Sequence, residues 1–118
     1  RKRGKTDILI EFENQNAYIG ECKIWHGEAQ IDPAIKQLLA YCTWRDTKCS
    51  LIYYCKNKKF TDVLKTIKEF LKNKHSTKII SSKELKSNMW ECEVQGDNSI
   101  IKMNLSIYNL YAKENIKA

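Results

Sequence analysis

The sequence has 118 residues, of which 42% are hydrophobic and 30% are charged, and this composition excludes an extended disordered or fibrous chain. No apolar run approaches the roughly 18 residues that a membrane-spanning helix requires, so we expect one cytoplasmic globular domain over residues 1–118. The formal net charge of +7 indicates a polyanionic partner, although a basic surface can also serve solubility alone.

The first two predicted elements are strands. Residues 7–13 and 17–25 are β-branched and aromatic runs, and the polar segment 14–16 between them is a predicted turn. A hairpin with this three-residue loop places Leu9 opposite Glu21. A loop one residue longer or shorter would turn every side chain of one strand to the other face, so the prediction depends on this register. One face is then an apolar layer of Ile8, Ile10, Phe12, Tyr18, Cys22 and Ile24.

The same register gathers charged side chains on the other face. Asp7 lies opposite Lys23, and Glu21 precedes Lys23 by two residues on the same strand. Two adjacent carboxylates repel each other unless a cation lies between them, and Mg²⁺ binds one or two carboxylates together with waters and phosphate oxygens. The backbone carbonyl of Cys22 offers a further ligand, and Lys23 would orient or help to deprotonate an attacking water. A solvated hairpin face with alternating glutamate and lysine explains the pattern equally well.

A helix is predicted from about Pro33 to Thr43, with Asp32 as its N-cap. Gln37 and Tyr41 lie four residues apart on one face of it, so both can reach one substrate or one metal-bound water. In the alternative interpretation, Tyr41 is a half-buried boundary residue and Gln37 is solvated. The apolar stripe that would pack on the sheet consists of Ile35, Leu38, Leu39 and Cys42.

Three motifs in this region resemble those of the PD-(D/E)XK nuclease superfamily, in particular its RecB-type members and related restriction and defence nucleases. They follow one another in the family's order within residues 1–55. A lone E-x-K is common, so the resemblance depends on the three motifs together. The motifs are Gly4-x2-Asp7 on the first strand, Glu21-x-Lys23 on the second, and Gln37-x3-Tyr41 on the helix.

The resemblance implies an endonuclease, a hydrolase that cuts DNA with Mg²⁺, with Mn²⁺ as a substitute and RNA as another possible substrate. Asp7, Glu21 and the Cys22 carbonyl would hold the metal, and Lys23 and Gln37 would complete the catalytic set. The expected contacts to nucleic acid are Lys5, Tyr41, Arg45 and Lys48.

The family core begins with a helix and a strand that have no counterpart before Arg1. The chain is therefore interpreted as a single nuclease-like domain, residues 1–118, which is either cut from a longer protein that carries further domains or a trimmed form of the fold. The edge of the first strand would be left open, which would allow a second copy to pair with it as a homodimer.

The remaining elements complete a predicted α/β, restriction-endonuclease-like mixed β-sheet flanked by helices, with a C-terminal β-hairpin. The strand at residues 49–55 should be buried on both faces and parallel to the second strand, because a helix connects the two. The others are a helix from Phe60 to about Lys74 with Thr61 as N-cap, an edge or parallel strand at 77–81, and strands at 89–95 and 100–108.

The five cysteines favour a reducing compartment, since their odd number and the absence of a C-x-x-C pair argue against a disulfide framework and a zinc site. Each lies in an apolar run, where a small buried hydrophobic side chain is the expected role. Two other functions remain open for the domain. One is a nuclease-like module that binds nucleic acid without cutting it, and the other is a protein-interaction domain that pairs through an exposed strand edge.

Overall fold

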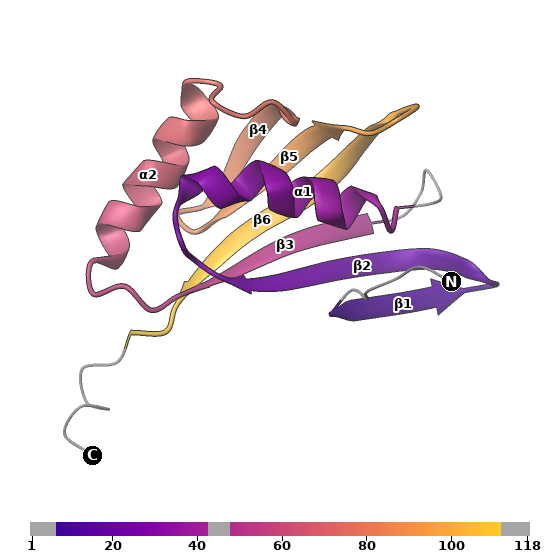
Figure 1. Ribbon diagram of the computed structural model, residues 1–118, viewed down its shortest axis with the longest axis horizontal. Coiled ribbons are helices and arrows are strands. Elements are labelled where there is room, and N and C mark those ends of the chain that lie inside the picture. The colour runs from indigo at the N-terminus through magenta and orange to yellow at the C-terminus, as the bar shows by residue number, and fades with distance from the viewer. Residues whose placement is uncertain (1–6, 43–47, 112–118) are drawn as a thin grey trace, which may run out of the picture.

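The computed structural model describes residues 7–42 and 48–111, apart from the side chains of Phe12, Gln15 and Asn16. These residues form a six-stranded mixed sheet with the strand order β1-β2-β3-β6-β5-β4, and both α-helices lie over one face of it (Figure 1). The predicted α/β class is confirmed. The elements are β1 (Ile8–Phe12), β2 (Gln15–Ile24), η1 (Glu28–Gln30), α1 (Ile31–Leu39), β3 (Lys48–Cys55), α2 (Phe60–Lys72), β4 (Ile79–Lys86), β5 (Met89–Gln95) and β6 (Ile100–Asn109).

The turn of the first hairpin is shorter than predicted. Glu13 and Asn14 have positive φ angles of 51° and 65°, as the two central residues of a type I′ turn do. This turn matches the twist of the flanking strands, and asparagine tolerates its left-handed conformation. The predicted pairing of Leu9 with Glu21 is therefore wrong, because Leu9 lies opposite Ile19.

The two strands nevertheless present their side chains on the predicted faces. The observed register differs from the predicted one by two residues, and side chains on a strand return to the same face every two residues. Ile8 pairs with Gly20, so Asp7 comes level with Glu21 and not with Lys23 as predicted. Nearer the turn, a β-bulge interrupts the ladder next to Ile10. Bulges of this kind re-aim side chains and increase the local strand twist.

The apolar layer predicted for the hairpin lies on the more exposed face of the sheet. Neither helix of the described residues covers the face that carries Ile10 and Ile24, and these side chains are 55% and 40% exposed. The helices instead cover the face that carries Ile19 and Glu21. β3 likewise alternates, since its helix-facing side is buried while Ile52 and Tyr54 on the other side are only half-buried, so it is not the fully buried strand that was predicted.

Helix α1 connects β2 to β3, and the two strands are parallel as predicted. Its buried face differs slightly from the predicted stripe, because Leu39 and Cys42 are only half-buried. Asp32 is not the N-cap, a position that Gln30 occupies without a side-chain hydrogen bond. The side chains of α1 that enter the core are Ile31, Ala34, Ile35 and Leu38.

The Asp32 carboxylate has another structural role. It accepts hydrogen bonds from Ser76 Oγ at 2.5 Å, Thr77 N at 2.7 Å and Thr77 Oγ1 at 3.1 Å. Ser76 and Thr77 lie between α2 and β4. Asp32 thus ties the first turn of α1 to a segment 44 residues further along the chain.

The second half of the chain adds α2 and an antiparallel meander of β4, β5 and β6. α2 begins at Phe60 as predicted, but Lys59 and not Thr61 is the N-cap. β6 is parallel to β3 on one side and antiparallel to β5 on the other, which joins the two halves of the sheet. None of the helices in residues 7–42 and 48–111 is long and apolar enough to cross a membrane.

Candidate metal centre

The Asp7 carboxylate lies at the edge of the sheet, just before the first residue of β1. Its Oδ2 atom accepts a hydrogen bond from the backbone N–H of Cys22 at 2.7 Å. The N–H and C=O groups of one strand residue point to the same side, so the Cys22 carbonyl faces this edge as well. The Cys22 carbonyl oxygen, which the sequence suggests as a metal ligand, therefore points toward the sheet edge where Asp7 lies.

Glu21 is the neighbouring carboxylate, and it points into the helix-covered face of the sheet. It is only 2% exposed, and its Oε2 atom has no hydrogen-bond partner among the described residues. A buried carboxylate without a partner is costly, and such an atom calls for an explanation such as a bound water or ion.

The donor set at this point suits a hard cation. Two carboxylates and a backbone carbonyl are all oxygen ligands, which Mg²⁺ prefers, and they leave positions for waters and phosphate oxygens. Within the described part of the chain, no group of three or more His, Cys, Asp and Glu side chains could hold a metal. A cation bound by Asp7, Glu21 and the Cys22 carbonyl would thus have few protein ligands, as is usual for Mg²⁺ in phosphate-handling sites.

The Cys22 thiol reports on the charge around this site. Burial raises its pKa, and the negative charges of Asp7 and Glu21 raise it further. Both carboxylates are therefore close enough to Cys22 to act on the same group. Their negative charges therefore oppose ionisation of this thiol.

Lys23 follows Glu21 by two residues on β2 and shares its face of the sheet. It is half-buried, and its neighbour in the parallel ladder is Tyr53 of β3. The Tyr53 side chain is 1% exposed, and among the described residues its hydroxyl has no hydrogen-bond partner. Burial raises the pKa of this phenol, so Tyr53 is a neutral hydrogen-bond donor next to Lys23.

Sequence reasoning missed Tyr53, because it treated residues 49–55 only as a buried strand. The sequence did carry a signal, because the hydroxyl of a tyrosine in the middle of a buried strand is itself buried. That hydroxyl must either find a hydrogen-bond partner or remain unpaired. The ring is held by Trp25, whose ring centroid lies 5.2 Å away in an edge-to-face arrangement.

The helix residues of the predicted site differ in their surroundings. Gln37 is exposed on α1, and Tyr41, just after the helix, is half-buried and packs against the core. Lys48 is exposed at the start of β3 and, by the strand alternation, lies on the sheet face opposite Glu21. The remaining predicted contacts, Lys5 and Arg45, lie outside the described residues.

Comparison with known proteins gives no relative: no family model, no curated protein and no solved structure matches the chain.

Proposed function

We propose that this domain is a Mg²⁺-dependent nuclease that hydrolyses phosphodiester bonds in DNA. The observation that carries the proposal is the buried Glu21 carboxylate, whose Oε2 atom lacks a partner among the described residues. Glu21 directly precedes Cys22, whose backbone N–H group donates a hydrogen bond to the Asp7 carboxylate. A cation held by both carboxylates would offset the cost of burying Glu21 and relieve the repulsion between the two charges.

Each residue has a distinct part in this proposal. Asp7, Glu21 and the Cys22 carbonyl would hold the metal, and the hydrogen bond from Cys22 N orients the Asp7 carboxylate. Bound Mg²⁺ supplies an activated water and neutralises charge that builds up on the phosphate. Lys23 carries only donors, so it can hold the attacking water or a phosphate oxygen near the metal.

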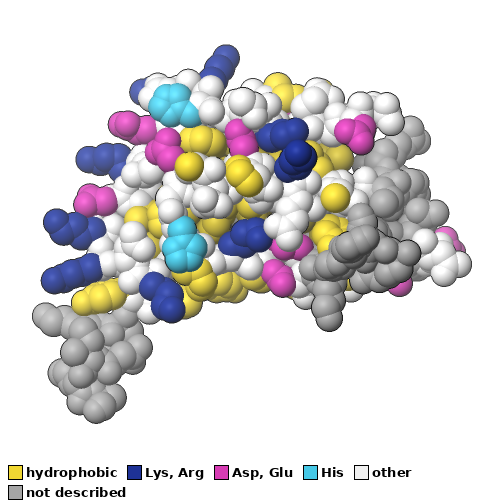
Figure 2. Space-filling model, in the orientation of Figure 1, with side chains coloured by type: hydrophobic (Ala, Val, Ile, Leu, Met, Phe, Trp, Pro, Cys, Tyr) yellow, Lys and Arg dark blue, Asp and Glu magenta, His cyan; other side chains and the backbone are white. Residues whose placement is uncertain are grey.

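The basic residues that would bind DNA lie at the end of the sheet where β2 and β3 finish. Lys58 and Lys59 follow β3 and, together with Trp25, line a cavity of about 530 Å³. Figure 2 shows lysine side chains gathered toward the α2 end of the molecule, and Lys65, Lys68 and Lys72 of α2 are exposed. Phosphate contacts by such residues supply most of the affinity for DNA without sequence preference.

The experiment compares Glu21→Gln with Glu91→Gln, which removes the same charge from a half-buried position on β5. Plasmid cleavage in Mg²⁺ should require the metal, stop with EDTA, and fall about 100-fold or more in Glu21→Gln. Glu91→Gln should cut at the parent rate. Salt-sensitive DNA binding without any Mg²⁺-dependent cleavage would instead identify a binding module, and the absence of both would favour a protein-interaction domain.

A further inference from the structure

The sheet face opposite the helices carries two tyrosines side by side. Ile24 of β2 pairs with Tyr54 of β3, and Tyr54 pairs with Tyr108 of β6, so the three side chains lie level on neighbouring strands. Both α-helices of the described residues lie over the other face (Figure 1), and we call this one the open face. Side chains alternate along each strand, which assigns every further residue of β2, β3 and β6 to one of the two faces.

The two tyrosine rings form one exposed aromatic area. The ring centroids of Tyr54 and Tyr108 lie 6.1 Å apart and the ring planes are tilted by 33°, within the range in which aromatic rings attract each other. Tyr108 is 40% exposed, as is Ile24 beside Tyr54, and Tyr54 is half-buried. Aromatic rings on an open sheet face are a surface on which unpaired nucleic-acid bases stack.

The charged side chains on the same three strands are basic. By the strand alternation, the open face of β2, β3 and β6 carries two charged residues among those described, Lys48 and Lys102, and both are exposed. Lys48 is also one of the nucleic-acid contacts predicted from the sequence. Its partner in the ladder is Tyr18 of β2, a third and half-buried tyrosine of the open face.

The carboxylates of the adjoining strand do not reverse this charge. Glu93 of β5 lies opposite Lys102, and Glu91 lies opposite Lys83 of β4. Both carboxylates are half-buried, whereas the lysines are exposed and reach farther into solvent. With Lys48 added, lysines outnumber carboxylates on the open face of these strands. This excess of positive charge complements a phosphate backbone.

The tyrosines and the lysines lie at opposite ends of one lane along β3 and β6. The lane has nearly the length of β3, about 20 Å at roughly 3.3 Å per residue. Between the two ends it carries Ile52 and three polar side chains, Ser50, Asn104 and Ser106. The half-buried amide of Asn104 can both donate to and accept from a base edge. A lane of this length fits about four nucleotides, the lower end of the site sizes of single-strand-binding folds.

We infer that the open face binds single-stranded nucleic acid through stacking of unpaired bases on Tyr54 and Tyr108. Lys48 and Lys102 hold its phosphate backbone. A duplex is not bound in this way, because its bases stack on one another and do not reach the rings. Glu21 points into the helix-covered face, so the strand binds on the other side of the sheet from the candidate metal centre. The inference goes beyond the proposed nuclease activity and does not depend on it.

The first test measures the affinity for a labelled oligothymidylate by fluorescence anisotropy in EDTA, which prevents metal-dependent cleavage. Changing Tyr54 and Tyr108 together to leucine keeps apolar volume but removes both ring faces, so the affinity should fall about tenfold or more. Changing both to phenylalanine keeps the rings and should leave the affinity within about twofold of the parent value. Oligouridylate, tested in parallel, distinguishes RNA from DNA as the source of the strand. Equal affinities of the leucine and phenylalanine variants would overturn the inference.

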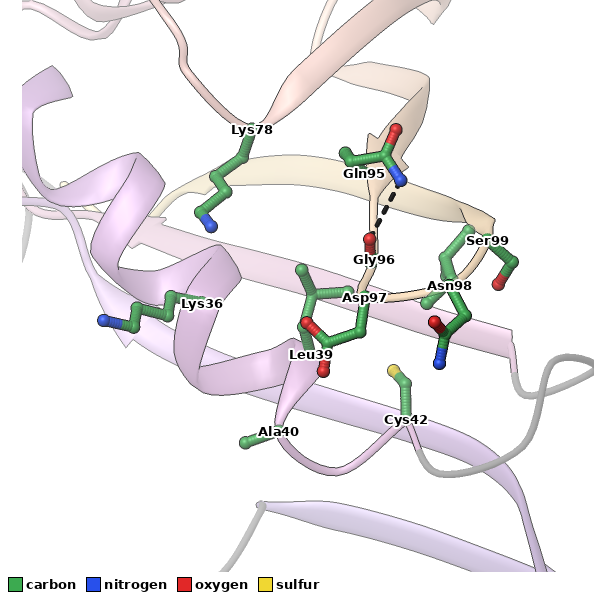
Figure 3. A pocket seen from close by; sticks show the side chains of 11 residues that line it. Lys36, Leu39, Ala40, Cys42, Lys78, Gln95, Gly96, Asp97, Asn98 and Ser99 are labelled. Atoms are coloured by element: carbon green, nitrogen blue, oxygen red, sulfur yellow. Dashed lines mark hydrogen bonds between the residues drawn. The ribbon is translucent and has the colours of Figure 1, made fainter.

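A second test addresses the lysines through the salt dependence of the same binding. Changing Lys48 and Lys102 together to glutamine should lower the slope of log affinity against log salt by about 1.4, because each contact to a single strand contributes about 0.7. The matched control changes Lys36 and Lys78, which line a cavity of about 670 Å³ between α1 and the β5–β6 turn (Figure 3). This control should keep the parent slope. The same loss in both double variants would contradict the proposed position of the strand.

A third test uses the unchanged protein. Ultraviolet crosslinking to an oligonucleotide that carries 5-bromouracil, followed by peptide mapping, should give adducts at Tyr54 or Tyr108. Adducts confined to α1 and α2 would overturn the inference. Sedimentation analysis tests a second copy of the chain as the occupant of the open face. A dimer that dissociates in the leucine double variant, with no change in oligonucleotide affinity, would assign this face to contact between copies.

Discussion

Glu21 is the residue whose placement demands the most explanation. Burial of an ionised carboxylate costs several kcal/mol unless hydrogen bonds or a counter-charge repay it. Lys23, two residues further on β2, is only half-buried, and the hydroxyl of Tyr53 beside it is also unpaired among the described residues. Unpaired polar atoms thus gather on one small area of β2 and β3, next to the edge where Asp7 lies.

Metal binding at Glu21 should appear in the stability of the domain. Mg²⁺ at about 100 times its dissociation constant should raise the free energy of unfolding by about 2.7 kcal/mol, because the metal binds only the folded state. Glu21→Gln should lose most of this gain, and Glu91→Gln should keep it. Chemical denaturation with and without Mg²⁺ measures the effect. An equal gain in Glu21→Gln and the parent protein would place the metal elsewhere.

Lys23 should matter for cleavage and much less for metal binding. Lys23→Ala should reduce Mg²⁺-dependent cleavage about 100-fold, because a donor to the attacking water or the phosphate is removed. Binding of Mn²⁺, followed by its paramagnetic signal, should change little. The matched control is Lys83→Ala, which removes an exposed lysine of β4. Cleavage at the parent rate in Lys23→Ala would refute the role proposed for this lysine.

Helix α1 owes its position to two kinds of contact. Its apolar face packs on the sheet, and the Asp32 carboxylate holds its first turn to Ser76 and Thr77. Gln37 and Tyr41, the helix motif of the proposed nuclease, depend on this placement. The contacts of Asp32 are charge-assisted and therefore stronger than those between neutral groups.

Asp32→Ala should destabilise the domain by about 2 kcal/mol more than Asp62→Ala. Both aspartates lie in the first turn of a helix, so both changes remove a similar favourable interaction with the helix dipole. Only Asp32 accepts the hydrogen bonds from Ser76 and Thr77. Urea denaturation of the two variants measures the difference, and equal losses would show that this tie contributes little.

The existence and faces of most elements could be predicted from the sequence, because apolar side chains follow the period of a strand or a helix. Trp90, Cys92 and Val94 of β5 are buried on one face as expected, and β5 begins and ends at the predicted residues. β4 extends well beyond the predicted strand at residues 77–81, since its remaining residues are exposed and, apart from Leu85, polar, so that they form a strand only by pairing with β5.

The features that could not be predicted depend on competition between local and tertiary interactions. Asp32 and Thr61 are favourable N-cap residue types, yet neither caps its helix. Asp32 binds a segment far along the chain instead, and no local pattern reveals that partner. For the site, the face of the hairpin on which each side chain lies could be predicted. The burial of Glu21 could not, because it depends on which face of the sheet the helices cover.

At the scale of the whole molecule, we expect DNA to bind to the lysine side chains at one end of the sheet and not to the net charge alone. Changing Lys58 and Lys59 together to glutamine should weaken DNA binding and lower the slope of log affinity against log salt by about 2, because each phosphate contact contributes about 0.9. Changing Lys83 and Lys86 of β4 removes the same charge and should leave most of the slope. All four side chains are exposed. Equal slopes in the two double variants would mean that DNA affinity depends on the net charge and not on lysines at the end of the sheet near Trp25.

The position of β6 has a consequence for how the protein is made. β6 is the last of the described strands to leave the ribosome, yet it occupies an interior place in the sheet between β3 and β5. Until it emerges, the β1–β2–β3 unit and the β4–β5 hairpin each expose an unpaired inner edge. Such edges readily join those of other nascent chains. The final strand therefore closes both edges in one step, and completion of the sheet must await the end of translation of β6.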